Sequence, residues 1–168
     1  MTDGSGKMIE FDYDLDFKKL DFTDFETRKL YRIGRGEQGV LLVRPYTDDI
    51  CKYWKFRTPA IAYQSANQIY FSYAEYRAKC DFIGMDMCRK FLEMGFTRAR
   101  RYANHKDGKK YDKNGNIRPQ EKDWATSDKA KSARIFKEYR DRVTKDAKYI
   151  SMRKMWREYE AGLTIINN

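Results

Sequence analysis

The sequence contains little histidine, cysteine or proline, and it has no long apolar run. The only histidine, His105, excludes zinc sites that need several histidine ligands. Three widely spaced cysteines, Cys51, Cys80 and Cys88, cannot form a disulfide framework and favour a reducing, cytoplasmic location. No stretch approaches about 18 apolar residues, so we expect no membrane-spanning helix and no membrane partner. The N-terminal residues lack the apolar segment of a secretory signal.

Aromatic and charged residues are abundant. Aromatic residues make up 15% and charged residues 36% of the 168 residues. That aromatic content is enough to build a core, and the length is typical of one domain. We therefore expect a flexible leader over residues 1–8, a single domain over residues 9–162 and a tail over residues 163–168. The sequence does not indicate an oligomeric state.

Charge is unevenly distributed along the chain, although the net charge is +10. Residues 1–27 carry eight acids against three lysines, a net charge of −5. Residues 97–118 carry eight bases against two acids, a net charge of +6. Residues 128–161 are also basic, but their charges alternate in sign as on a solvated helix face. The segment 97–118 therefore indicates a polyanionic partner most directly.

The first third of the chain has features of extended structure. Aromatic and acidic residues alternate over residues 9–25, a period typical of a strand with one buried face. Two short apolar runs, residues 30–33 and 40–43, flank a glycine-rich stretch, which predicts a β-hairpin. We expect an α+β fold that is mainly helical, with an N-terminal extended segment and a glycine-rich β-hairpin packed on a helical core.

The remaining chain has the periodicity of helices. Thr58 and Pro59 are typical of a helix start, and apolar spacing continues this helix to about Lys79. A second helix is predicted from about residue 81, with Gly95 as its C-terminal cap, followed by a short helix over 97–104. Residues 105–127 predict a mobile loop or small hairpin, and helices follow from Asp128 with a break near Lys145.

The basic segment is the strongest candidate binding site. A row of guanidinium groups can make bidentate contacts to phosphates, lysines extend such a surface, and aromatic rings can stack on bases. The predicted phosphate-binding residues here are Arg98, Arg100, Arg101, His105, Lys106, Lys109 and Lys110, with Tyr102 and Tyr111 as stacking residues. Two other interpretations stay open: the basic residues pair with the acidic N-terminal segment, or they are simply solvated.

The glycine-rich stretch is a second candidate. Gly34, Gly36 and Gly39 have the spacing of a dinucleotide-binding loop, but that motif needs a helix after the loop, and here a strand is predicted. The glycines can still bring backbone N–H groups near a phosphate, with Arg35 and Arg44 as possible contacts. The alternative is an ordinary tight turn.

His105 is the single catalytic candidate. The stretch Asn104-His105-Lys106-Asp107-Gly108 resembles part of the HNH nucleases, in which a histidine activates water beside a divalent metal. A further upstream histidine ligand is missing, so a loop histidine without catalytic role is the competing interpretation. We expect no metal site and no cofactor.

Three strings of residues resemble a known family. They are GRGEQGVLLVRP (34–45), GMDM with RKF (84–91), and MGFTRARRYANH (94–105). Together they are similar to an uncharacterised family of small cytoplasmic proteins, a domain of unknown function shared by bacteria, fungi and tailed phages. The resemblance covers roughly residues 9–150 and implies no reaction. It implies that the glycine-rich stretch and the Arg–His segment belong to one shared pattern.

Three functions follow as hypotheses. The first is a small basic cytoplasmic protein that binds nucleic acid or another phosphate-bearing polyanion through residues 97–118. The second, suggested by the phage membership of the family, is an interaction factor that binds a host or defence protein. The third is an enzyme acting on nucleotides or nucleic acid with His105 as the base.

Overall fold

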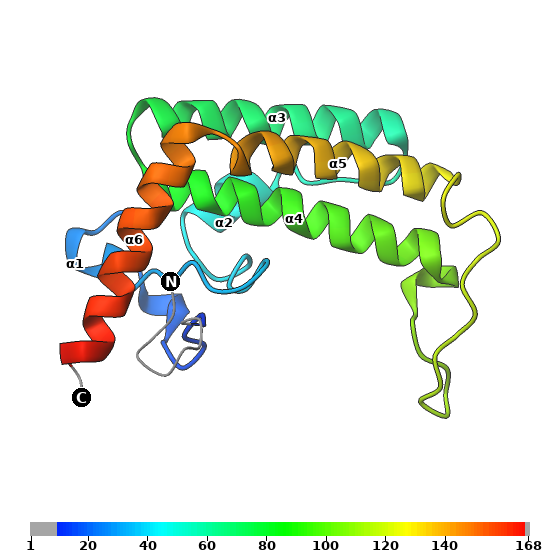
Figure 1. Ribbon diagram of the computed structural model, residues 1–168, viewed down its shortest axis with the longest axis horizontal. Helices are drawn as coiled ribbons and strands as arrows, with labels where there is room; N and C mark the ends of the chain where they lie inside the picture. The colour runs from blue at the N-terminus through cyan, green and yellow to red at the C-terminus, as the bar shows by residue number, and fades with distance from the viewer. Residues whose placement is uncertain (1–9, 167–168) are drawn as a thin grey trace.

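We describe residues 10–166 of a computed structural model (Figure 1). The expected leader, residues 1–8, lies outside the described residues. The elements in chain order are η1 (Phe17–Lys19), α1 (Phe25–Arg28), α2 (Tyr46–Cys51), α3 (Pro59–Ala78), α4 (Phe82–Asn104), η2 (Lys106–Gly108), α5 (Asp128–Thr144) and α6 (Ala147–Ile166). No helix within residues 10–166 is long and apolar enough to cross a membrane. The last helix includes part of the segment 163–168 that we expected to be a tail.

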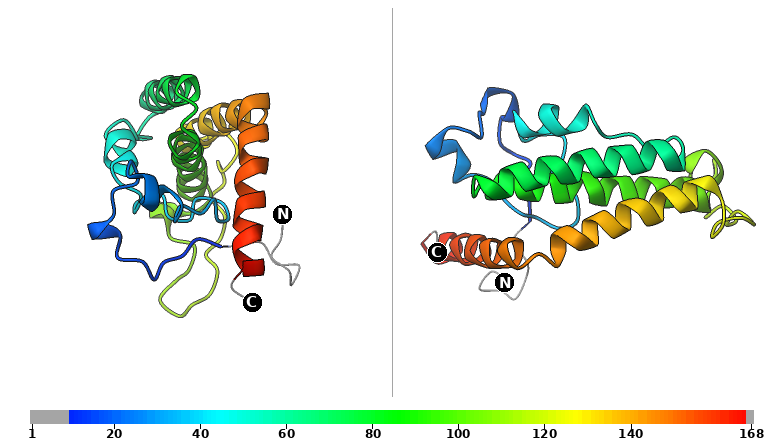
Figure 2. Two further views of the ribbon diagram at one scale, coloured as in Figure 1. Left: turned by 90° about the vertical axis from the view of Figure 1, so that its left-hand side faces the viewer. Right: turned by 90° about the horizontal axis from the view of Figure 1, so that it is seen from above.

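Helices α3, α4 and α5 lie side by side and form the body of the molecule (Figure 1, Figure 2). Two glycines of α4 allow this close packing. A Cβ on Gly84 would lie 2.3 Å from the ring of Tyr76 in α3, and a Cβ on Gly95 would lie 2.5 Å from the ring of Phe136 in α5. Gly95 is therefore a packing position inside a long helix, and its predicted role as a helix cap is wrong.

Helix α6 turns away from the three-helix body (Figure 2). It bonds to the N-terminal segment at Lys29, Tyr31 and Ile33. A chain of aromatic rings fills the space between them. Phe11 stacks on Phe17 with ring centroids 5.3 Å apart, and Phe17 stacks on Phe22 at 6.1 Å. The chain continues edge-on through Tyr31 to Trp156 of α6, at 6.5 and 5.9 Å. Aromatic burial thus attaches the irregular N-terminal segment to the helices.

The predicted α+β fold class is wrong, because the described residues contain helices and no strand. The glycine-rich β-hairpin fails in particular. Gly34, Gly36 and Gly39 have φ of 68°, 57° and 79°, and the backbone bonds between them run from residue i to i−3, as in successive turns. Such turns leave no ladder of backbone hydrogen bonds between residues 30–33 and 40–43. We call residues 34–39 the glycine loop.

The predicted N-terminal extended segment is also wrong over its described part. Its aspartates bond to nearby backbone groups: Asp12 Oδ1 accepts from the N–H of Asp14 at 2.9 Å, and Asp21 Oδ1 accepts from the N–H of Thr23 at 2.9 Å. These local bonds make turns that compete with a strand. Of the residues that alternate with the aspartates, Phe11 and Phe17 are buried, whereas Tyr13 is exposed.

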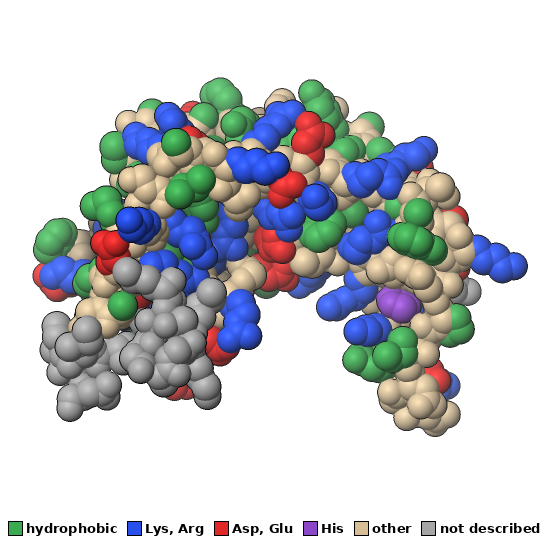
Figure 3. Space-filling view, viewed as in Figure 1, with side chains coloured by type: hydrophobic (Ala, Val, Ile, Leu, Met, Phe, Trp, Pro, Cys, Tyr) green, Lys and Arg blue, Asp and Glu red, His purple; other side chains and the backbone are tan. Residues whose placement is uncertain are grey.

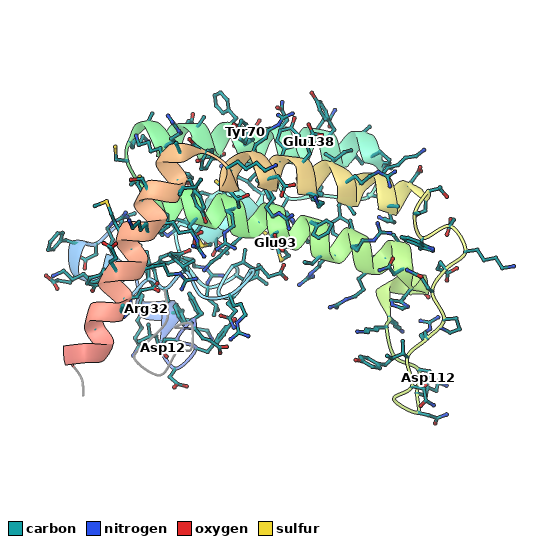
Figure 4. The ribbon with its side chains drawn as sticks, viewed as in Figure 1. Asp12, Arg32, Tyr70, Glu93, Asp112 and Glu138 are labelled. Carbon is teal, nitrogen blue, oxygen red and sulfur yellow. The ribbon has the colours of Figure 1, made fainter. Side chains whose placement is uncertain are left out.

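Residues 105–127, between α4 and α5, extend from the end of the body, with Asp112 at the tip (Figure 4). We call them the hanging segment. It folds back on itself at Gly115, and a single antiparallel bridge joins Tyr111 to Ile117. Its start is anchored by a backbone bond of 2.8 Å from the N–H of Glu121 to the carbonyl of Asn104. This segment and the N-terminal segment flank a hollow on the underside of the molecule (Figure 3).

Candidate anion-binding surface

Helix α4 connects the core with the predicted basic site. Asp81 caps its N-terminus by accepting from the N–H of Gly84 at 3.2 Å. Nearly every side chain from Phe82 to Gly95 is buried, whereas the later turns are largely exposed. The short helix predicted over residues 97–104 is the last part of this one helix.

The three arginines of this part of α4 have different surroundings. Arg98 and Arg101 are exposed, and Arg98 places its guanidinium 5.8 Å from the Trp54 ring. Arg100 is half-buried and donates to the carbonyl of Trp124. Its guanidinium also lies 5.8 Å from the centroid of the Trp124 ring. No described carboxylate forms an ion pair with any of the three. Arg100 therefore supports the hanging segment, and Arg98 and Arg101 face solvent.

Of the remaining predicted residues, Tyr102 lies in α4, and the three lysines and Tyr111 lie in the segment that follows it. Lys109 and Lys110 are exposed, and the Nζ of Lys110 lies 5.6 Å from the ring of Tyr111, itself 55% exposed. Tyr102 is partly used for packing, since it contacts Phe56 with centroids 5.8 Å apart. Lys106 is the first residue of η2. Of the two predicted stacking residues, Tyr111 thus has the more accessible ring.

His105 follows the last turn of α4 and donates its backbone N–H to the carbonyl of Arg101 at 2.9 Å. Its side chain is half-buried, and its Nδ1 has no hydrogen-bond partner among the described residues. No cluster of three or more His, Cys, Asp or Glu suited to a metal ion occurs within residues 10–166. The catalytic role of His105 stays a prediction.

The glycine loop is fixed by cations that lie far away in the sequence. Arg89 donates to the carbonyl of Gly36, and Arg157 donates to the carbonyl of Gly34 at 2.7 Å. Lys90 donates to the carbonyl of Arg32 at 3.1 Å, just before the loop. Two of the backbone N–H groups that we expected to approach an anion already bond to side chains: Arg35 N–H donates to Gln38 Oε1 at 2.9 Å, and Gly39 N–H donates to the Tyr13 hydroxyl at 3.2 Å.

A fully buried carboxylate, Asp86, organises these cations. It accepts from the hydroxyls of Tyr31 and Tyr149, the latter at 2.7 Å, and from Arg89 Nε at 2.9 Å. Burial opposes its ionisation, but the charges of Arg89 and Lys90 and the two hydroxyl bonds hold the pKa of Asp86 below its ordinary value. Burial also lowers the pKa of Lys90 to about 7, against the attraction of Asp86. The cluster is thus a buried ionic network that spans α4, α6 and the N-terminal segment.

Beside this network lies a hollow of about 640 Å³ between the glycine loop, α4, α5 and α6. We call it the arginine pocket. Six cationic residues line it: Arg35, Arg89, Arg140, Arg153, Lys154 and Arg157. Two carboxylates, Glu93 and Asp141, also line it, and both pair with Arg140 at 2.8 and 2.9 Å. Glu93 marks the α4 side of this region in Figure 4.

The glycine loop and the basic segment do come together. Thr97 Oγ1 of α4 donates to Glu37 Oε2 of the loop at 2.8 Å. Arg35 lines both the arginine pocket and a smaller neighbouring hollow that Arg98 also lines. Arg35 is also paired with Glu10 at 2.6 Å, so the acidic N-terminal segment neutralises it. Arg44 pairs with Asp48 at 3.2 Å and lines neither hollow.

The sequence patterns did not identify the buried arginines that line the arginine pocket. Arg89 and Arg157 are 8% and 3% exposed, and neither was among the predicted residues. The usable signal was the placement of Asp86, Arg89 and Lys90 at helical spacings of 3 and 4 inside an otherwise apolar stretch. Charges in such surroundings are nearly always paired, so they predict a buried ionic network.

The family comparison covers these features except Glu10 and the end of α6, which includes Glu160. The family model described as Domain of unknown function (DUF4385) matches residues 12–159, which include the glycine loop, the whole of α4 and the arginine pocket. No curated protein and no solved structure matches the chain. The chain belongs to the DUF4385 family.

Proposed function

We propose that this protein binds nucleic acid, or another phosphate-bearing polyanion, through the exposed part of residues 97–118. The observation that supports this most is that Arg98 and Arg101 are exposed and have no described carboxylate partner. Both lie on the last turns of α4. An arginine without a carboxylate partner keeps its full charge and its hydrogen-bond donors for a ligand.

The neighbouring residues suit the same ligand. Lys109 and Lys110 extend the positive charge along the hanging segment, and the exposed ring of Tyr111 offers a stacking surface. Lys and Arg side chains border the hollow on the underside of the molecule (Figure 3). Contacts of this kind are made to phosphates, so we expect affinity with little sequence preference.

The compartment is part of the proposal. The three cysteines of the chain are free thiols, which supports a reducing compartment such as the cytoplasm. A partner protein with an acidic surface is the competing hypothesis, because the same arginines would attract carboxylates.

The test is the salt dependence of binding to labelled DNA and RNA oligonucleotides. The wild type should lose affinity steeply as salt rises. The double variant Arg98→Ala, Arg101→Ala should flatten the slope of log affinity against log salt by about 0.9 for each lost duplex phosphate contact. Arg142→Ala with Lys145→Ala is the matched control, since it also removes two positive charges, from a different hollow.

A wild-type affinity that does not change with salt would overturn the proposal. So would an equal loss in the Arg142/Lys145 control, because that result would reflect net charge alone. Capture of an acidic protein after nuclease treatment, with no retention on nucleic acid, would favour the interaction hypothesis instead.

A further inference from the structure

We infer that the arginine pocket is a receptor for a single phosphomonoester group. The inference goes beyond the proposed function, because the pocket is formed by different residues from the exposed part of residues 97–118. The group belongs either to a free nucleotide or to the phosphorylated end of a nucleic-acid strand, and its chemistry is the same in both cases.

The first argument is the charge balance of the pocket. Four of its six cations already have carboxylate partners: Arg35 with Glu10, Arg89 with Asp86, Arg140 with Glu93 and Asp141, and Arg157 with Glu160. The other two, Arg153 and Lys154, form no ion pair with any described residue. Because Arg140 has two carboxylate partners, the six cations face five carboxylates and keep a net charge of +1. A phosphomonoester, which carries a charge of about −1.5 to −2 at neutral pH, can pair with Arg153 and Lys154 together.

The second argument is the rigidity of the wall that the ligand would meet. Arg89 and Arg157 are held by Asp86 and Glu160 and by the carbonyls of the glycine loop. Tyr149 is fixed by its bond to Asp86. Side chains that are already ordered lose little conformational entropy when a ligand binds, so this wall is preorganised.

The third argument concerns the size and form of the ligand. A hollow of about 640 Å³ has room for more than one phosphate group, and it lies in the range of about 300–1,000 Å³ that is usual for small-molecule sites. Glu93 and Asp141 line the pocket from α4 and α5, whereas Arg153 and Lys154 line it from α6. Their negative charge disfavours a long polyanion across the pocket and confines one compact anion to the α6 side.

The experiment compares ligands that differ only in the phosphomonoester. The probes are adenosine monophosphate against adenosine, and a 5′-phosphorylated oligonucleotide against the same strand with a 5′-hydroxyl. We expect the phosphorylated form to bind at least about tenfold tighter in one or both pairs, as is usual for charge-assisted hydrogen bonds. The monophosphate pair alone would identify a free nucleotide, and the oligonucleotide pair alone would identify a strand end.

Two double variants make the test specific. Arg153→Ala with Lys154→Ala should abolish the preference for the phosphorylated form and leave the salt slope of the 5′-hydroxyl strand unchanged. Arg142→Ala with Lys145→Ala removes the same charge from a different hollow and should leave the preference intact. Arg98→Ala with Arg101→Ala should weaken the 5′-hydroxyl strand and not the monophosphate, so the two proposals can fail separately.

The pH dependence gives a second readout. Because the second pKa of a phosphomonoester is about 6, the preference should shrink when the pH falls from about 7.5 to about 5.5. Equal binding of the phosphorylated and unphosphorylated forms in both pairs would overturn the inference. Equal losses in the Arg153/Lys154 and Arg142/Lys145 variants would overturn it as well.

Discussion

The two halves of α4 use charge in opposite ways. In the first half, Asp86, Arg89 and Lys90 are buried, and each has partners of opposite charge or polar partners from other segments. In the second half, Arg98 and Arg101 are exposed and form no ion pair within the described residues. The same kind of side chain on the same helix thus fixes structure at one end and is available to a ligand at the other.

Burial explains the difference. Taking a charge out of water costs several kcal/mol unless a partner compensates it, so the buried charges must be matched. An exposed arginine has no such requirement, because water solvates it. A basic stretch in a sequence therefore has functional meaning only after its buried members have been separated from its exposed ones.

The largest expected effect on stability comes from disrupting the buried ion pairs in the first half of α4. Asp86→Asn removes the negative charge between Arg89 and Lys90 while keeping the shape of the side chain. Removing one partner of a buried ion pair usually costs about 3–5 kcal/mol, because the remaining charge stays uncompensated. We expect a loss of that size in the free energy of unfolding, measured with urea by circular dichroism.

The matched control is Asp48→Asn, since Asp48 pairs with Arg44 on the surface. Its effect should be at most about 1 kcal/mol, as for other exposed pairs. A similar loss in both variants would contradict the distinction between buried and exposed charge in this protein.

A smaller effect concerns the pH dependence of stability. The pKa of Lys90 is about 7 in the folded protein, below its ordinary value of 10.5, so in that interval the unfolded chain binds a proton that the folded chain does not. The Lys90 contribution to stability therefore rises with pH above about 7. Ionisation of Cys88 in the unfolded state opposes this near pH 9.0, because burial raises the pKa of that thiol in the folded state.

We therefore expect Lys90→Met to flatten the stability profile between about pH 7 and 9, by up to about 2–3 kcal/mol over that interval. Urea unfolding at several pH values measures this. Lys131→Met, at an exposed position of α5, should keep the wild-type profile. A Lys90→Met profile parallel to the wild type would mean that the lysine is not desolvated as described.

Local signals in the sequence predicted the starts of the long helices well, although not the end of α4. The helix that begins after Thr58 is confirmed, with Pro59 in its first turn and the Thr58 hydroxyl accepting from Ile61. The start of α5 at Asp128 and the break near Lys145 are confirmed as well. These features depend on residues a few positions apart, which is why they can be predicted from one sequence.

The N-terminal segment could not be predicted in the same way. Its conformation depends on partners far along the chain, such as the bond from the N–H of Ile33 to Glu160, 127 residues away. The same applies to the arginine pocket, because composition identifies the basic segment but not which arginines become buried. A period-two pattern of aromatic and acidic residues predicts a strand, but here the aspartates form turns.

The smallest expected effect is on the stability of the double variant Arg98→Ala, Arg101→Ala. Neither side chain has an ion-pair partner among the described residues, and surface substitutions of this kind usually change the free energy of unfolding by less than about 0.5 kcal/mol each. Urea unfolding of this variant beside Arg89→Ala, which removes a donor to Asp86 and to the glycine loop, gives the sharpest form of the comparison. If the Arg98/Arg101 variant lost as much stability as Arg89→Ala, the exposed half of α4 would be structural, and weaker nucleic-acid binding by that variant would reflect unfolding.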